Sequence, residues 1–239
     1  MPDLPAHLTA PEYVRAVDYG HVTVLIDYRH GGVRCLLPPG GEHWRRAAVT
    51  GRSEYLPAPL ATRLLEAGLL HPAARPEPWP APMRAHAPRA SWGSVEHSAG
   101  IERPPAPPEP DATLAVNALN AVAKAAAGDP AAAMRRITGL IASIVSPDRP
   151  PAGLEQAHEA VLAVRRAGWY RRARSSCLET SAAAAFLIAS RSRSITWCHG
   201  VAPDPVRLHA WLQTADGHTV AEPESTLSFT PVLTLGEHP

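Results

Sequence analysis

The chain has 239 residues, a formal net charge of +1 and an aromatic fraction of 5%. This length suits one large domain or two small ones, and the absence of a basic stripe or aromatic-rich surface argues against a nucleic-acid partner. The sequence contains no apolar run of membrane-spanning length and no signal peptide at its start, and its three cysteines lie far apart. We therefore expect a cytoplasmic protein with free thiols, no disulfide framework, no metal and no other cofactor.

Residues 1–71 predict a small module in which strands are followed by helices. Extended segments are expected at 12–17, 21–27 and 33–37, and short helices at 42–49 and 60–70. Gly31 and Gly32 indicate the turn between the last two strands. Such a three-stranded meander with helices has a thin core for an independent domain.

Prolines dominate residues 72–110. Proline fixes φ and removes a backbone donor, so this segment is expected to be an extended, semi-rigid linker and not a helix or central strand. Trp92, in its middle, either docks on a neighbouring domain or belongs to a disordered tether.

Residues 111–239 predict an alanine-rich helical region followed by strands. Helices are expected at 111–127, 131–145, 154–167 and 178–190, and strands at 194–199, 208–214, 218–221 and 227–235. The pair Asp216-Gly217 is typical of a hairpin turn. The whole chain is thus expected to be α+β.

Cys177 is the strongest candidate for a nucleophile because it lies where an apolar helix begins. Free N–H groups at a helix start favour a thiolate and can donate to an oxyanion, with the N–H of Cys177 itself as one candidate. The structural alternative is that Cys177 is a small buried residue, as free cysteines usually are. Cys198 lies within a predicted strand and is expected to be buried and inert, and Cys35 lies on a predicted strand of the first module and is expected to pack.

His209 is the candidate base because a histidine fixed on a strand can reach a thiol carried by a helix. The alternative is a half-buried histidine with no catalytic role. A base of this kind needs a third group that holds its tautomer, and two acids follow it in sequence. We prefer Glu222, on the strand expected beside His209, to Asp216, which suits the geometry of the turn.

Residues 174–222 resemble the B2 protease of lasso peptide biosynthesis, a transglutaminase-like or papain-like cysteine peptidase. The motifs are Cys177-Leu178-Glu179-Thr180-Ser181, then Gly200-Val201, then His209-Ala210-Trp211-Leu212, then Asp216-Gly217 and an acid. The resemblance implies a cysteine nucleophile, a histidine base and an orienting aspartate. These roles carry over to Cys177, to His209 and, by position, to Glu222, where glutamate replaces the aspartate of the family.

Residues 19–32 resemble the B1 element of the same pathways, a PqqD-like, winged-helix-type module that binds a leader peptide. In that family the leader adds a strand to the edge of the meander beside the last helix. By position, the leader-binding residues would be Val33, Arg34, Cys35, Leu36 and Leu37 on the strand, with Leu60 and Leu64 on the helix. Residues 50–59 depart from the pattern, because they are too few for the middle helix of the family. A degenerate domain kept for packing is the alternative.

Together the two resemblances imply a fused B1–B2 protein that cleaves the leader from a ribosomal precursor peptide. They also imply a partner, an ATP-dependent, asparagine-synthetase-like lactam synthetase. Two other functions stay open. One is a transglutaminase-like acyltransferase, in which an amine captures the thioester. The other is a peptide-binding protein without catalysis.

Overall fold

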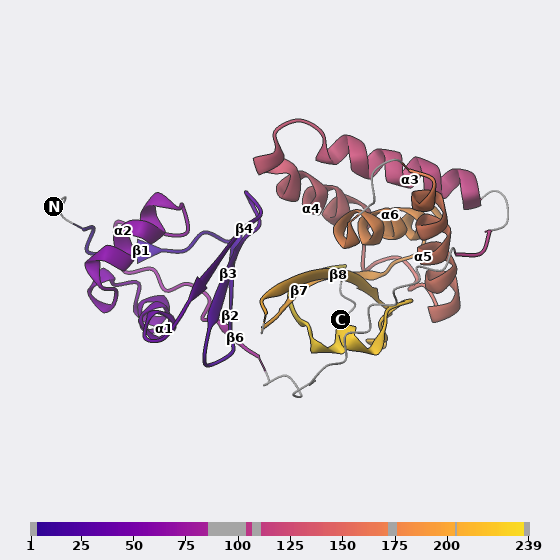
Figure 1. Ribbon diagram of the computed structural model, residues 1–239. Helices are drawn as coiled ribbons and strands as arrows, with labels where there is room; N and C mark the ends of the chain where they lie inside the picture. Colours follow the sequence, from indigo (N-terminus) through magenta and orange to yellow (C-terminus); the bar gives the residue numbers. More distant parts are fainter. Residues whose placement is uncertain (1–3, 86–103, 107–110, 172–175, 204, 237–239) are drawn as a thin grey trace. The chain divides into compact units, whose positions relative to one another are not determined.

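The computed structural model describes residues 4–85, 104–106, 111–171, 176–203 and 205–236, and the chain divides into two compact units, residues 1–87 and 88–239 (Figure 1). Each unit has its own layer of helices and its own sheet, so the architecture is α+β. Trp92 lies outside the described residues.

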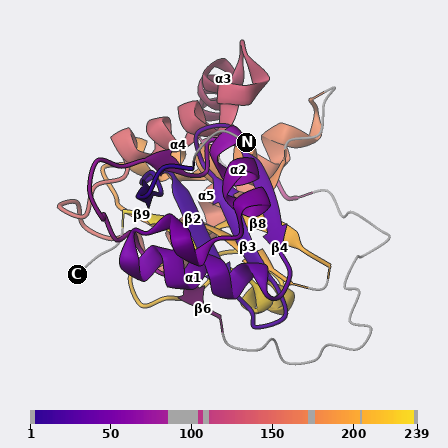
Figure 2. The ribbon, with the colours of Figure 1, turned by 90° about the vertical axis from the view of Figure 1, so that its left-hand side faces the viewer.

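Unit 1 contains the expected meander. Its elements are β1 (Leu8–Thr9), β2 (Val14–Asp18), β3 (Thr23–Asp27), β4 (Gly32–Leu36), α1 (Gly40–Thr50), the 3₁₀ helix η1 (Ser53–Tyr55), α2 (Ala58–Glu66), β5 (His71–Pro72) and β6 (Met83–Arg84). The main sheet has the order β4-β3-β2-β6, with α1 across one face (Figure 2). Leu25 of β3 and Trp44 of α1 are buried in the core between them. α2 ends at Glu66, earlier than expected, and Gly68 just beyond it takes a left-handed φ of 68°.

Residues 72–84 differ from the expected linker because they pack on unit 1. β5 pairs with β1, and β6 runs parallel to β2. Between them, Trp79 is 6% exposed and makes an edge-to-face contact with Trp44, with ring centroids 5.5 Å apart. A thin core gains from this strap because a buried indole contributes a large apolar area. The proline content of the segment hid the two short strands and the buried tryptophan.

The strap also explains why residue 51 is glycine. Gly51 ends α1 with a left-handed φ of 68°, and a Cβ there would lie 2.4 Å from the backbone nitrogen of Glu77 in the strap. Gly68 has the same φ but nothing within 4 Å of its Cβ position. The two glycines thus form a matched pair that separates backbone strain from a clash with the strap.

We expect Gly51→Ala to lower the free energy of unfolding of unit 1 by about 2–4 kcal/mol, from a left-handed alanine together with overpacking. Gly68→Ala should lower it by about 1–2 kcal/mol, from the backbone alone. Hydrogen exchange of the α1 amides in the full chain, measured against urea concentration, gives both values. Equal losses in the two variants would show that the strap does not pack against Gly51.

Unit 2 places helices on one face of a three-stranded sheet (Figure 1). Its elements are α3 (Asp111–Ala126), η2 (Pro130–Ala132), α4 (Ala133–Ile144), α5 (Leu154–Trp169), α6 (Cys177–Ser190), β7 (Thr196–Ala202), β8 (Arg207–Gln213), η3 (Glu224–Ser228) and β9 (Thr230–Leu235). The strand order is β8-β7-β9, all antiparallel. α6 is buried between the other helices and the sheet, and its alanines 182–185 are fully buried.

Two of the strands expected in unit 2 are shorter or absent. Residues 218–221 form no strand, and Thr219 makes only an isolated bridge with Gln213. Residues 227–228 end the 3₁₀ helix η3, and the last strand begins at Thr230. Within the described residues, no helix is both long and apolar enough to cross a membrane.

Candidate active site

Cys177 is the first residue of α6, and the cap of this helix is built by its neighbours. The Ser176 hydroxyl accepts from the Glu179 N–H at 3.2 Å, and a Glu179 carboxylate oxygen accepts from the Ser176 N–H at 2.8 Å. This reciprocal capping box fixes the first turn, where Cys177 is an exposed residue whose sulfur is partly shielded from water by His209 and Ala210. The sequence Ser176-Cys177-Leu178-Glu179 therefore sets both the start of the helix and the place of the thiol.

His209 lies on β8, the edge strand of the sheet, and aromatic rings hold its imidazole. The ring stacks on Trp211, with centroids 5.8 Å apart and planes at 12°, and meets Phe229 at 5.2 Å. Gly200 on β7 lies opposite His209, and a Cβ there would come within 2.7 Å of the Trp211 ring. Glycine at this position lets Trp211 lie close to the sheet.

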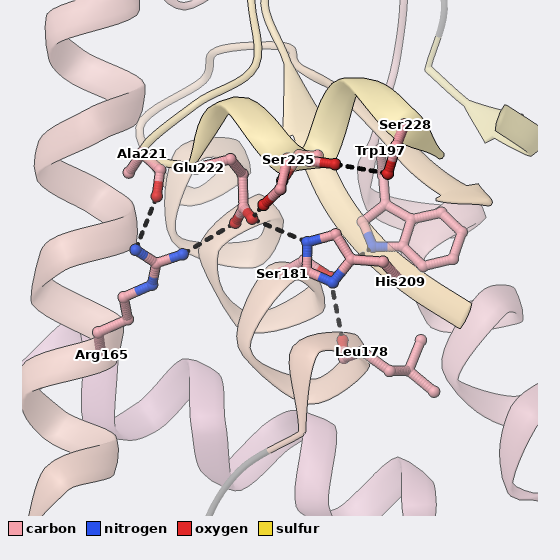
Figure 3. Close-up of polar contacts among 10 residues, drawn as sticks. Arg165, Leu178, Ser181, Trp197, His209, Ala221, Glu222, Ser225 and Ser228 are labelled. Carbon is pink, nitrogen blue, oxygen red and sulfur yellow. Dashed lines mark hydrogen bonds and ion pairs between the residues drawn. The ribbon is translucent and has the colours of Figure 1, made fainter. Parts of the chain in front are cut away.

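Glu222 holds the far side of the imidazole (Figure 3). His209 Nε2 lies 2.8 Å from Glu222 Oε2, and the Glu222 side chain is 9% exposed. The Thr226 hydroxyl donates to the same carboxylate oxygen at 3.2 Å. Because Glu222 takes Nε2, the ring nitrogen left for Cys177 is Nδ1.

The three groups line one pocket of about 270 Å³. Its wall also contains side chains from α5, among them Val161 and Arg165, and from the segment after β8, among them Val220. The structure therefore brings Cys177, His209 and Glu222 together from a helix, a strand and a loop. The chain turns back at Asp216-Gly217 as expected, since Thr219 bridges Gln213 and the Val220 N–H donates to Leu212 O, but the paired stretch is too short to be a strand and Glu222 lies beyond it.

The thiol and the imidazole favour their charged forms. Burial would raise the pKa of Cys177, but hydrogen bonds from His209 and from the N–H groups of Ala210 and Leu178, together with the charge of His209, lower it below the ordinary value. Burial would lower the pKa of His209, but the hydrogen bonds and charges of Cys177 and Glu222 raise it to about 9. A thiolate–imidazolium pair is thus favoured over a pH range that begins below the ordinary thiol pKa, where Cys177 loses its proton, and ends at about pH 9, where His209 loses its proton.

Asp216 does not reach His209. Its carboxylate bonds the Thr214 hydroxyl and lies 2.8 Å from His218 Nδ1 within the turn, where its side chain is 68% exposed. The hydrogen bond from Thr214 is the main cause of its lowered pKa. This is the turn role that the sequence indicated for Asp216.

The other cysteines do not line the pocket. Cys198 is buried as expected, with its Sγ 3.2 Å from Gln213 Oε1. Cys35 is exposed on β4, which corrects the expectation that it packs. Its strand is the sheet edge, so one of its sides has no neighbouring strand among the described residues.

The residues expected to bind a leader fall into two groups. Val33, Arg34 and Cys35 lie partly or fully exposed on the edge strand β4, and Leu37 just after it is 68% exposed. Leu36 and Leu64 are only 9% and 3% exposed because they pack in the core of unit 1. Their side chains are therefore not available on the surface, whereas Leu60 is half-buried.

Arg165 is the site residue that the sequence analysis missed. It lies on α5, 57 residues before Glu222, and its Nη2 donates to Glu222 Oε1 at 2.8 Å. An arginine on an amphipathic helix looks like any solvated charge, so no motif marks it. Thr226 was also missed, because it lies in the 3₁₀ helix η3, in the stretch between the expected strands 218–221 and 227–235 for which no element was expected.

The comparisons with known proteins concern this unit. Residues 129–234 match the family model of the transglutaminase-like superfamily, so this part of the chain is similar to transglutaminase-like domains. Members of that superfamily are often cysteine peptidases or acyltransferases. No curated protein and no solved structure matches the chain.

The ion pair predicts how alkylation of Cys177 by iodoacetamide depends on His209. His209→Ala removes the hydrogen bond and the charge that lower the thiol pKa, so that pKa should rise. Alkylation at pH 6 should then slow by about tenfold or more, since each pKa unit is a tenfold change in thiolate fraction. Peptide mass spectrometry reads each site separately, and Cys35 in unit 1 is the internal control. An unchanged rate at Cys177 would contradict the pairing.

Proposed function

We propose that the chain is a cysteine peptidase that binds a ribosomal precursor peptide by its leader and cleaves the leader from the core during lasso peptide maturation. The observation that supports it best is the Cys177–His209–Glu222 array at one pocket, with thiol and imidazole pKa values displaced in the directions that favour an ion pair. The cytoplasm and a lactam synthetase partner belong to the same proposal.

In this mechanism the Cys177 thiolate attacks the carbonyl carbon at the end of the leader, and a tetrahedral oxyanion forms. Backbone N–H groups at the start of α6, with the N–H of Cys177 as the candidate, would donate to that oxyanion. The imidazolium of His209 protonates the departing amine, which releases the core and leaves a thioester between Cys177 and the leader. His209, now neutral, deprotonates a water that attacks the thioester, and the leader leaves as a carboxylate. Glu222 keeps the ring oriented throughout.

The leader is proposed to add a strand to the free edge of β4. On the other edge of this sheet, β6 already pairs with β2. The N–H of Gly31 donates to Asp27 O at 2.8 Å, and Tyr28 N–H donates to Tyr13 O on the opposite side of β3. By strand alternation, the backbone groups of Cys35 therefore point away from β3, toward the free edge. Main-chain bonding at such an edge is a common way to bind an extended peptide.

Acyl transfer is the second candidate, because the same superfamily contains acyltransferases and the same thioester would form. The two reactions differ in the group that attacks the thioester. Mass spectrometry of the products separates them, since hydrolysis yields a leader with a free carboxylate and transfer yields a leader joined to an amine.

Cys177→Ala should abolish cleavage of a ribosomal precursor peptide, with a loss of about 10⁴-fold or more, as for other nucleophile deletions. His209→Ala should be comparably inactive because the two groups act as a unit. Leader affinity should be unchanged in both variants, which calorimetry with the isolated leader measures. Residual cleavage in Cys177→Ala would assign the nucleophile elsewhere.

Cys35→Pro should weaken leader binding by about 2- to 10-fold, because it removes one outward N–H donor worth about 0.5–1.5 kcal/mol. Proline is tolerated on an edge strand where the missing N–H is not part of the ladder. Cys35→Ala changes the side chain and keeps the donor, so it should bind as the parent does. Equal affinities for both variants, measured by fluorescence anisotropy in a Cys177→Ala background, would exclude this edge.

A further inference from the structure

The guanidinium of Arg165 joins α5 to two consecutive residues after β8 (Figure 3). Its Nη1 donates to the Ala221 carbonyl oxygen at 2.7 Å, and its Nη2 donates to Glu222 Oε1 at 2.8 Å. The planar fork of arginine can make two such bonds at a fixed spacing, which the ammonium group of lysine cannot reproduce. Arg165 therefore fixes the backbone before the acid as well as the acid itself.

The carboxylate of Glu222 is held on both oxygens. Oε1 accepts from Arg165, while Oε2 accepts from Thr226 and bonds His209. Glutamate has one more rotatable bond than aspartate, so its carboxylate needs more contacts to stay in one place. Arg165 and Thr226 supply the additional hydrogen bonds that hold the Glu222 carboxylate in one place.

The backbone at Ala221 also needs support. Ala221 has a φ of 54°, in the left-handed region that costs a non-glycine residue about 1 kcal/mol or more. This conformation turns the chain so that Glu222 enters the pocket beside His209. The bond from Arg165 to the Ala221 carbonyl holds the turn in place.

We propose that Arg165 is a positioning residue that acts through Ala221 and Glu222 to hold the His209 ring toward Cys177. The proposal rests on the thiol chemistry of the proposed function, but not on the identity of the substrate. Among the described residues, the hydrogen bonds of Arg165 go to Ala221 and Glu222 and not to the Cys177 sulfur or the His209 ring.

A role by position and a role by charge predict opposite changes in the pKa of His209 when Arg165 is replaced. If Arg165 acted only by its positive charge, its removal would raise the pKa of both Cys177 and His209. If it acts by position, its loss loosens Glu222 and then His209. The thiol then loses its partner and its pKa rises, while the imidazolium loses its acceptor and its pKa falls. The pH range of the ion pair therefore narrows from both ends.

The test is the rate of Cys177 alkylation by iodoacetamide between pH 5 and 10, in a Cys35→Ser background. The parent should show two steps, the first as the thiolate forms and the second as the imidazolium loses its proton. Arg165→Lys keeps the charge and removes the fork, so the first step should move to higher pH and the second to lower pH. At pH 6 the rate should fall by about tenfold for each unit that the first step moves.

Arg166→Lys is the matched control, since Arg166 is the next residue on α5 and bonds Pro104 O at 2.8 Å outside the pocket. It should leave both steps unchanged. In a Glu222→Ala background, Arg165→Lys should not move either pH step any further, because Arg165 acts through the Glu222 carboxylate. The proposal would be overturned if Arg165→Lys showed the two pH steps of the parent. It would also be overturned if the losses of alkylation rate caused by Arg165→Lys and Glu222→Ala added up in the double variant.

Thermal unfolding of each variant shows whether it is folded. If Arg165→Lys is unfolded, Arg165→Gln is used in its place. Loss of the His209 proton at a lower pH than in the parent supports positioning, and loss at a higher pH overturns it. A parent profile with a single step at the ordinary thiol pKa would refute the ion pair, and thereby both this inference and the proposed function. A normal two-step profile without precursor cleavage would refute only the proposed function.

Discussion

The hydrogen bond of 2.8 Å between His209 Nε2 and Glu222 Oε2 is the interaction on which the candidate site depends. It settles which ring nitrogen faces Cys177, and it raises the pKa of the imidazole against the effect of burial. Most of the local structure serves this bond: Trp211 and Phe229 hold the ring, and Arg165 and Thr226 hold the acid. The capped start of α6 then places the sulfur against a base whose orientation is already fixed.

The two units differ in what their cores bury and in what they leave exposed. Unit 2 buries an alanine-rich helix, which lets neighbouring helices and the sheet approach closely, while Cys177 at the start of α6 stays exposed. Unit 1 has a small core that includes the strap residue Trp79. The same strap ends in β6, which pairs with β2. β4 is thus left as the edge of the main sheet without a neighbouring strand among the described residues.

The elements with a strong periodic pattern or a cap could be predicted from sequence, and the irregular ones could not. The apolar, alanine-rich run after Cys177 marked α6, and the strand-like run 208–214 marked β8. The strap was missed because proline content outweighed one buried tryptophan. Glu222 was identified from the Asp216-Gly217 turn, but its final place also depends on a left-handed alanine and on Arg165 of a distant helix. Such tertiary contacts leave no local signal in a single sequence.

The proposed function requires that Cys177 become acylated by the leader. The most direct measurement is intact-protein mass spectrometry of the full chain, quenched in acid during its reaction with a ribosomal precursor peptide. We expect a transient mass increase equal to the acyl leader, located on Cys177 and removed by hydroxylamine. Formation of free core without any adduct on Cys177, under conditions that preserve a thioester, would rule out this acylation.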